Sequence, residues 1–283
     1  MLYRFIIILL LYSFNVNAAP YVVASIKPFH SIVAALTENI YTTKLLLNSN
    51  QDAHNFHLKT SQISHIKKAD ILIIVDPHFE SGLKKIIASI STDKTIIIAD
   101  ISKIHLLKNN ENSYKNYHLW LNINNMKVAA NSIARTLIEI DPLNHSAYNN
   151  NLQTLLSRLE QLDKEIKSKL SKIIDYPIAT YSNTFQYFLK SNKLQNPVMV
   201  TKYHGDRLSL YEAIKARKSI KKHKTSCMLS DIDVPNARID TITSDLGTNN
   251  ISIDVMGYDI EDGPEHYFKL MSNITDKVVE CLQ

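Results

Sequence analysis

The stretch from Pro142 to Ile174, PLNHSAYNNNLQTLLSRLEQLDKEIKSKLSKII, decides the fold of this 283-residue chain. Its apolar residues recur at steps of three and four residues, the period of one helix face. They are Leu152, Leu155, Leu159, Leu162, Ile166, Leu170 and Ile173. Asp141 can cap such a helix, and Pro142 fits its first position. We therefore predict one helix over 142–174, about 50 Å long at 1.5 Å per residue.

Two arrangements can bury this apolar stripe. A coiled-coil arm between two copies would need sustained heptads, and the stripe lasts little more than three. A helix covered by both halves of its own chain is therefore favoured. We expect it to join two lobes of a monomer.

On either side of this helix, short β-branched runs alternate with helical patterns, which indicates parallel sheets built from βα units. The predicted strands are 21–26, 42–47, 71–75 and 95–99 in the first half, and 178–181, 198–201, 226–230 and 239–243 in the second. We predict an α/β protein of two lobes, each with a four-stranded parallel sheet flanked by helices. The expected boundaries are 20–141 for the N-terminal lobe, 142–174 for the linking helix and 175–283 for the C-terminal lobe.

Residues 1–19 have the pattern of a secretory signal peptide. Arg4 precedes an apolar run, and small residues follow up to Ala18 and Ala19, where we expect cleavage. The run is too short for a membrane span, which needs roughly 20 apolar residues. Because no cysteine lies near the cleavage point, we expect a soluble exported protein without a lipid anchor.

Cys227 and Cys281, the only cysteines, permit one disulfide, and thiols of an exported chain tend to oxidise. Two separate buried thiols are the alternative.

The net charge of +5 excludes few classes of protein. The one dense basic stretch, 215–224, has no interleaved aromatic residues for stacking on bases. A solvated helix face is therefore favoured there, and nucleic acid is not an expected partner.

Histidines and aspartates follow the predicted strands of both lobes. They are His54, His78, His204, Asp231, Asp233 and Asp245, to which His118 adds a further imidazole beside the only tryptophan. Ligands of open parallel sheets bind beyond the carboxyl ends of the strands. Singly, such a residue is more often a surface or capping group. Together, the imidazoles and carboxylates indicate a site for a small cation between the lobes.

Several segments resemble the periplasmic solute-binding proteins of zinc and manganese ABC transporters, most closely the zinc-uptake branch. They are VVASIKP at 22–28, Ala53-His54, ADI at 69–71, HLWL at 118–121, FQYF at 185–188, LGTN at 246–249, and the two cysteines, which look like the disulfide of the family. The resemblance covers nearly the whole mature chain. It implies two α/β lobes bridged by a rigid helix, with one divalent metal, Zn2+ or Mn2+, bound between them and delivered to a membrane permease.

The resemblance transfers His54 and His118 as metal ligands, but it does not transfer the others. Ser182 stands where zinc-binding members carry a third histidine, and Ser244 stands at the aspartate of the family, with Asp245 one residue later. The histidine-rich acidic loop of many zinc-binding members is also absent, since 108–115 is rich in asparagine. Zinc prefers four ligands, and two imidazoles alone make a poor site.

Three outcomes fit these departures. His57, His78 or His204 can supply a third imidazole. Asp245 or Asp231 can supply a carboxylate, which makes a harder site suited to manganese or iron. Alternatively, the site is degenerate and the lobes serve as an adhesin or interaction protein. We favour metal binding, with His204 and Asp245 as the remaining candidates.

An exported metal-dependent hydrolase is the rival class. Such an enzyme needs a metal-bound water and a general base. The chain contains no His-Glu-x-x-His motif and no Gly-x-Ser-x-Gly motif, and its five glycines offer little for phosphate-binding loops. We therefore do not expect an enzyme.

Overall fold

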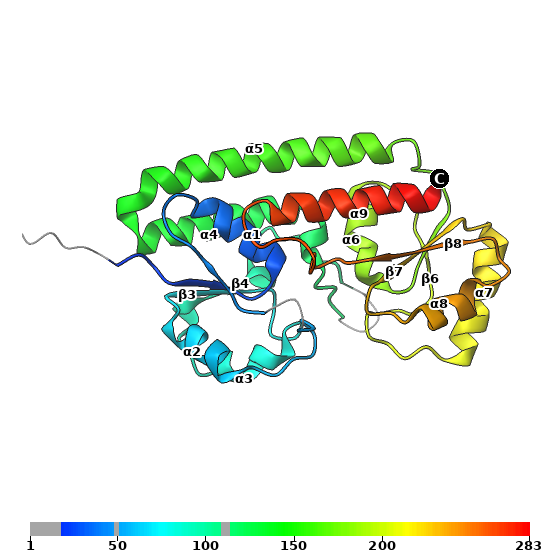
Figure 1. Cartoon of the computed structure of the whole chain (residues 1–283), viewed down its shortest axis with the longest axis horizontal. Coiled ribbons are helices and arrows are strands. Elements are labelled where there is room, and N and C mark those ends of the chain that lie inside the picture. Colours follow the sequence, from blue (N-terminus) through cyan, green and yellow to red (C-terminus); the bar gives the residue numbers. More distant parts are fainter. Residues whose placement is uncertain (1–17, 48–50, 109–113) are drawn as a thin grey trace, which may run out of the picture.

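The computed structural model describes residues 18–47, 51–108 and 114–283, so most of the expected signal peptide lies outside it. Two four-stranded parallel sheets form the centres of two lobes, as predicted (Figure 1). The strand orders are β2-β1-β3-β4 and β6-β5-β7-β8. The first sheet comprises β1 (Val22–Ala24), β2 (Lys44–Leu45), β3 (Ile71–Ile74) and β4 (Thr95–Ile97). The second comprises β5 (Ile178–Thr180), β6 (Val198–Met199), β7 (Cys227–Asp231) and β8 (Asn249–Ile253).

Helices flank both sheets. Those of the N-terminal lobe are α1 (Lys27–Leu36), α2 (Thr60–Lys68), α3 (Lys84–Ile87) and α4 (Ile123–Ile140). Those of the C-terminal lobe are α6 (Gln186–Ser191), α7 (Leu210–His223) and α8 (Asn236–Thr243). Each predicted βα unit places a loop at the carboxyl end of its strand, and the loops of the two lobes face each other.

The predicted linking helix is present as α5 (His145–Leu170), preceded by a 3-10 turn over Pro142–Asn144. Its 26 residues span about 39 Å, less than predicted, because the helix ends at Leu170. The apolar stripe of the helix is buried, as its period required. Each fully buried leucine of this stripe stabilises the fold by roughly 1.5–3 kcal/mol.

A second helix, α9 (His266–Leu282), also spans both lobes. It lies beside α5 and contacts α1 of the N-terminal lobe as well as β7 and β8 of the C-terminal lobe (Figure 1). A continuous apolar core runs beneath the two helices from one lobe to the other. The two lobes are therefore packed against each other along their length and not merely linked by α5.

The eighth strand lies elsewhere than predicted. Residues 239–243 belong to α8, and the strand at the edge of the second sheet is β8, which pairs with all five residues of β7. Ile239 and Ile242, three residues apart, bury one face of α8, and this spacing is helical. As a consequence, Asp245 precedes the last strand, whereas the sequence analysis placed it after that strand.

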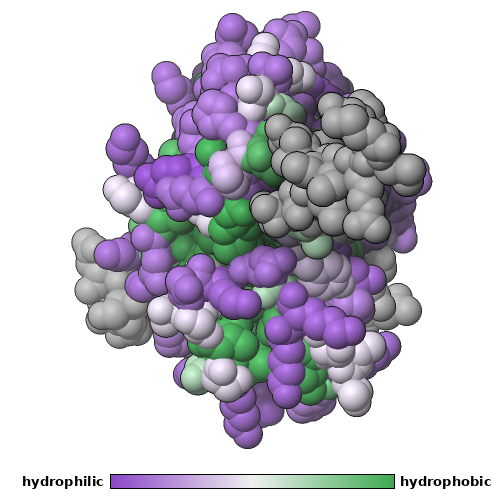
Figure 2. Space-filling model, turned by 90° about the vertical axis from the view of Figure 1, so that its left-hand side faces the viewer, coloured by the Kyte–Doolittle hydropathy of each residue, from purple (hydrophilic) through white to green (hydrophobic). Residues whose placement is uncertain are grey.

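Within the three described ranges, no helix is both long and apolar enough to cross a bilayer. The end of the molecule formed by the N-terminal lobe carries mostly hydrophilic residues, with hydrophobic side chains gathered in smaller patches between them (Figure 2).

The predicted disulfide is present and joins β7 to the last turn of α9, with the Cα atoms of Cys227 and Cys281 5.4 Å apart. We expect replacement of both cysteines by serine to lower the free energy of unfolding by about 4 kcal/mol, because the bridge closes a long loop in the unfolded chain. Urea denaturation measures the loss, and reduction of the wild type provides the matched comparison. An unchanged midpoint in both experiments would contradict this prediction.

Candidate metal centre

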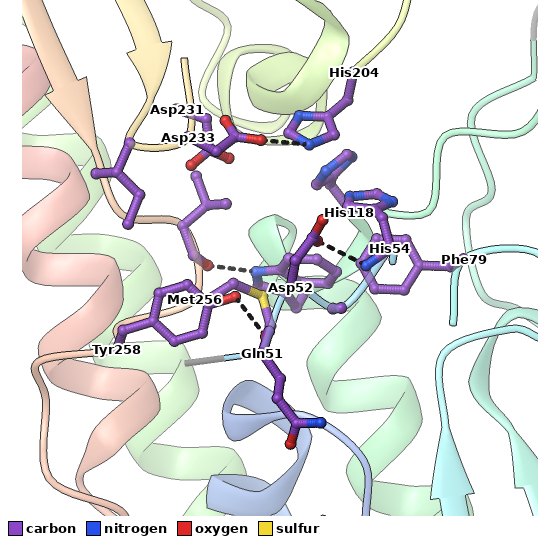
Figure 3. A pocket seen from close by; sticks show the side chains of 14 residues that line it. Gln51, Asp52, His54, Phe79, His118, His204, Asp231, Asp233, Met256 and Tyr258 are labelled. Carbon is purple, nitrogen blue, oxygen red and sulfur yellow. Dashed lines mark hydrogen bonds and ion pairs between the residues drawn. The ribbon is translucent and has the colours of Figure 1, made fainter. Parts of the chain in front are cut away.

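Three histidines from both lobes meet in the cleft between the sheets (Figure 3). His54 lies in the loop after β2, His118 directly precedes a 3-10 helix at Leu119–Leu121, and His204 lies in the loop after β6. One ring nitrogen of each lies within 4.8 Å of the corresponding nitrogens of the other two. The rings of His54 and His204 are stacked, with centroids 4.5 Å apart. Three imidazole nitrogens thus converge on a space that one ion can occupy.

Two aspartates extend this cluster on the side of the C-terminal lobe. Asp231 ends β7 and Asp233 follows two residues later, and both offer an oxygen within 4.8 Å of a ring nitrogen of His204. The Nε2 atom of His204 is 3.1 Å from Oδ2 of Asp233. These residues line a cavity of about 310 Å³. Three imidazoles and a carboxylate are donors from which tetrahedral zinc sites are built.

Two of the imidazoles, those of His54 and His118, are in the neutral form that can bind a metal ion. Burial, with a smaller contribution from the nearby His204, lowers the pKa of His54 to about 3. Burial also lowers the pKa of His118 well below its usual range. Both rings are therefore neutral at neutral pH, and each has a nitrogen lone pair to offer.

His204 behaves differently because it is paired. Burial alone would lower its pKa, but the hydrogen bond and the charge of Asp233 raise it overall. Burial would raise the pKa of Asp233, yet its contact with His204 lowers it. Burial raises the pKa of Asp231 to about 7, and the charge of Asp233 contributes. The raised pKa of His204 and the lowered pKa of Asp233 mean that the pair favours a proton on Nε2 of His204, shared with the Asp233 carboxylate.

The orientation of His118 is fixed by Asn116. The Nδ1 atom of His118 lies 2.9 Å from Oδ1 of Asn116, which also accepts the backbone N–H of His118 at 3.0 Å. The amide nitrogen of Asn116 donates to the carbonyl of Asn183 at 2.8 Å, so its oxygen must face the imidazole. Nδ1 of His118 therefore carries the proton, and Nε2 is free for a metal.

We expect Asn116→Leu to weaken metal binding about 10–100-fold, because the substitution removes the group that holds the ring and its tautomer. Competition with a chromogenic chelator measures the change. Asn131→Leu, at an exposed position of α4, is the matched control and is expected to leave the affinity unchanged. Equal affinities of the two variants would contradict this role of Asn116.

Ser182 supports the cluster indirectly. Its hydroxyl oxygen lies 2.9 Å from Oγ1 of Thr184, which is 3.2 Å from Nδ1 of His204. When Nδ1 donates its proton to Thr184, the Thr184 hydroxyl can donate in turn to Ser182. Ser182 thus helps to orient His204, which lies in a different loop.

The structure does not bring the other sequence candidates to this cluster. Asp245 is exposed and follows α8. It belongs to neither of the two clusters of potential metal ligands among the described residues. The reason is that the segment expected to be a strand before it is a helix. His57 and His78 are exposed, and His78 is bonded to Asp76 at 2.8 Å instead. The sequence analysis noted Asp233 after β7 but preferred Asp245.

The carboxylate that does follow the last strand, Asp254, is occupied by the backbone. It accepts N–H groups from Met256, Gly257 and Tyr258 in the turn that leads toward α9. The sequence did contain a signal for this turn. The alternating pattern Asn-Ile-Ser-Ile at 250–253 is typical of a strand, and Asp254 follows it directly.

Two parallel-sheet lobes, joined by a long helix around a buried histidine cluster, define a two-lobe solute-binding protein with a metal-type site. Residues 22–281 match the family profile described as zinc-uptake complex component A, periplasmic. The chain belongs to this family.

Individual relatives are distant but cover most of the chain. The high-affinity zinc uptake system protein ZnuA of Brucella abortus is 23% identical, over 92% of this chain and 91% of its own length. The manganese ABC transporter substrate-binding lipoprotein scaA of Streptococcus gordonii is 26% identical, over 89% and 87%. The solved structure of FpvC from P. aeruginosa in complex with Ni2+ matches with a TM-score of 0.81 at 23% identity, covering 94% of this chain and 97% of that one. At this identity, the structural likeness shows the fold.

Proposed function

We propose that this protein captures a divalent metal ion in the cleft between its lobes and delivers it to an ABC permease. Zn2+ is the preferred cargo and Mn2+ the alternative. The observation that carries the proposal is the convergence of three imidazoles from both lobes within 4.8 Å. The relatives named for zinc and manganese uptake support the same reading.

In this proposal, His54, His118 and His204 are the ligands, and Asp233 is the fourth. An arriving cation is attracted by the carboxylates that line the cavity, Asp231 and Asp233 among them. It displaces the proton shared by His204 and Asp233, while the two neutral histidines bind without losing a proton. The imidazole-rich set favours zinc over the harder manganese. The group of three imidazoles, with the carboxylate of Asp233 beside His204, also argues against the degenerate alternative with an adhesin role.

Because both lobes supply ligands, the bound ion ties them together, and the permease would recognise this metal-loaded form. We further propose that the chain reaches the periplasm through a cleaved signal peptide, acts there as a monomer and carries no lipid anchor. Membership of a periplasmic family supports this location.

The test is to strip the purified mature protein with chelator and add Zn2+ or Mn2+ separately. We expect one ion to bind per chain, and we expect zinc to raise the melting temperature more than manganese does. Free ion at a thousandfold excess over Kd would stabilise the folded chain by about 4.1 kcal/mol. Bound metal is counted by elemental analysis, and melting is followed by circular dichroism. A wild type that takes up neither ion would refute the proposal.

A further inference from the structure

Helix α7 of the C-terminal lobe exposes large apolar side chains to solvent. Leu210, Tyr211 and Ile214 are 77%, 74% and 59% exposed, and all three lie in the first turns of the helix. The opposite face of the helix buries Ala213, Ala216 and Ile220 against the lobe. The exposed residues therefore do not stabilise the packing of α7. Clustered apolar exposure of this kind marks an interaction surface.

Basic residues continue the same exposed face toward the end of α7. Leu210, Ile214, Lys218 and Lys221 follow one another at steps of four, four and three residues, and Lys222 lies beside them. Lys218, Lys221 and Lys222 are exposed. None of these three lysines forms a salt bridge within residues 18–47, 51–108 and 114–283. One helix face is thus apolar in its first half and positively charged in its second.

The lysines alone have a simple explanation, since cations near the C-terminus of a helix interact favourably with its dipole. This explanation does not account for the exposed Leu210, Tyr211 and Ile214. A second copy of this chain is a poor partner for the patch, because a two-fold interface would bring like charges together. A surface that combines diffuse negative charge with an apolar interior suits both halves of the helix face.

We propose that α7 docks the protein on an anionic phospholipid surface. Leu210, Tyr211 and Ile214 enter the headgroup region, where tyrosine and aliphatic side chains are favoured. Lys218, Lys221 and Lys222 bind the headgroup phosphates, each strengthening attachment about fivefold near an anionic surface.

The position of α7 gives this docking a consequence for the metal site. Figure 1 shows α7 at the outer end of the C-terminal lobe, away from α5. His204 lies in the loop that leads into the first turn of α7. The same loop therefore connects the proposed metal site to the helix that we propose to contact the membrane.

The test is sedimentation of the mature protein with vesicles of phosphatidylcholine alone, or of equal parts phosphatidylcholine and phosphatidylglycerol. We expect binding only to the anionic vesicles, weakened by added salt. The triple variant Lys218→Gln, Lys221→Gln, Lys222→Gln is expected to bind about a hundredfold more weakly. The triple variant Leu210→Ser, Tyr211→Ser, Ile214→Ser is expected to lose stable attachment.

The matched control replaces three exposed lysines of the other lobe, Lys67, Lys68 and Lys85, by glutamine. It carries the same change in net charge and is expected to bind the vesicles like the wild type. Metal affinity and melting temperature, measured on every variant, separate a docking defect from a folding defect. Absence of binding to anionic vesicles at low salt would overturn the proposal, as would equal losses in the control and the lysine variant. Either result leaves the metal site untouched.

Discussion

Replacement of His118 by alanine is expected to weaken zinc binding by about a thousandfold. Structural zinc sites bind with apparent free energies of about 10–16 kcal/mol, so each of four ligands carries about 2.5–4 kcal/mol, and His118 is expected at the upper end of this range. His118 is the most deeply buried of the three histidines, and Asn116 already holds its ring in place. In the variant, a water molecule can replace the imidazole as a ligand, but no side chain would hold it in position. Competition with a chromogenic chelator over a range of zinc concentrations measures the affinity.

Asp245→Ala provides the matched control for this experiment, because the sequence alone nominated that residue and the structure places it away from the cluster. Its zinc affinity is expected to equal that of the wild type. Asp233→Ala is expected to fall between the two, since water can occupy the fourth position of a zinc site. Wild-type affinity in His118→Ala would refute the proposed site, whereas a loss in Asp245→Ala would restore the sequence-based assignment.

Replacement of Lys27 by methionine is expected to lower the free energy of unfolding by about 1–3 kcal/mol, the cost of leaving a buried hydrogen-bonding group without its partner. Lys27 is buried at the start of α1, and its ammonium group lies 3.0 Å from Asp262. It also donates to the carbonyls of Tyr258 and Ile260, at 2.9 and 2.7 Å. These contacts tie the N-terminal lobe to the segment between β8 and α9. The substitution would leave carbonyl groups without a donor in a dry environment.

Urea denaturation followed by circular dichroism measures this loss. Lys84→Met, at an exposed position of α3, is the control and is expected to change stability by less than about 0.5 kcal/mol. Comparable midpoints for the two variants would contradict a structural role for the buried lysine.

The parts of the fold that depend on a strong local pattern could be predicted from the sequence. The leucine stripe of α5 specifies its buried face, and the β-branched runs at 71–75 and 178–181 specify central strands. The single possible cysteine pair is also formed. These features are set by residues close in sequence or by elimination, and tertiary packing reinforces them.

The last strand was predicted wrongly because its local pattern is ambiguous. The segment Arg-Ile-Asp-Thr-Ile-Thr at 238–243 is rich in β-branched residues, as strands are, but its two isoleucines, Ile239 and Ile242, lie three residues apart on one helix face. Residues 249–253 alternate at Asn-Ile-Ser-Ile, but they begin with two asparagines, which are depleted in strands, and their pairing with β7 stabilises them as a strand. The error propagated to the site, since it moved the expected carboxylate to Asp245.

The partnership of His204 and Asp233 illustrates what sequence could not supply. The two residues follow different strands, and their contact depends on the path of two loops. His54 and His118 could be selected because recognisable segments surround them. The sequence analysis also named His204, as a residue of the C-terminal lobe, but only the structure shows that its ring lies beside those of His54 and His118.

The hydrogen bonds between the two lobes have a consequence for the release of a bound ion. Besides Lys27, the indole of Trp120 donates to the carbonyl of Val255 at 2.8 Å, and the hydroxyl of Tyr267 donates to the carbonyl of Trp120 at 2.7 Å. These hydrogen bonds disfavour a motion that separates the two lobes as rigid bodies. If the proposed site holds a metal ion, we expect its release to involve a local movement of the loop that carries His204. Gly205 sits next to it at a φ of +82°, a backbone setting that glycine adopts without strain, and can serve as the pivot.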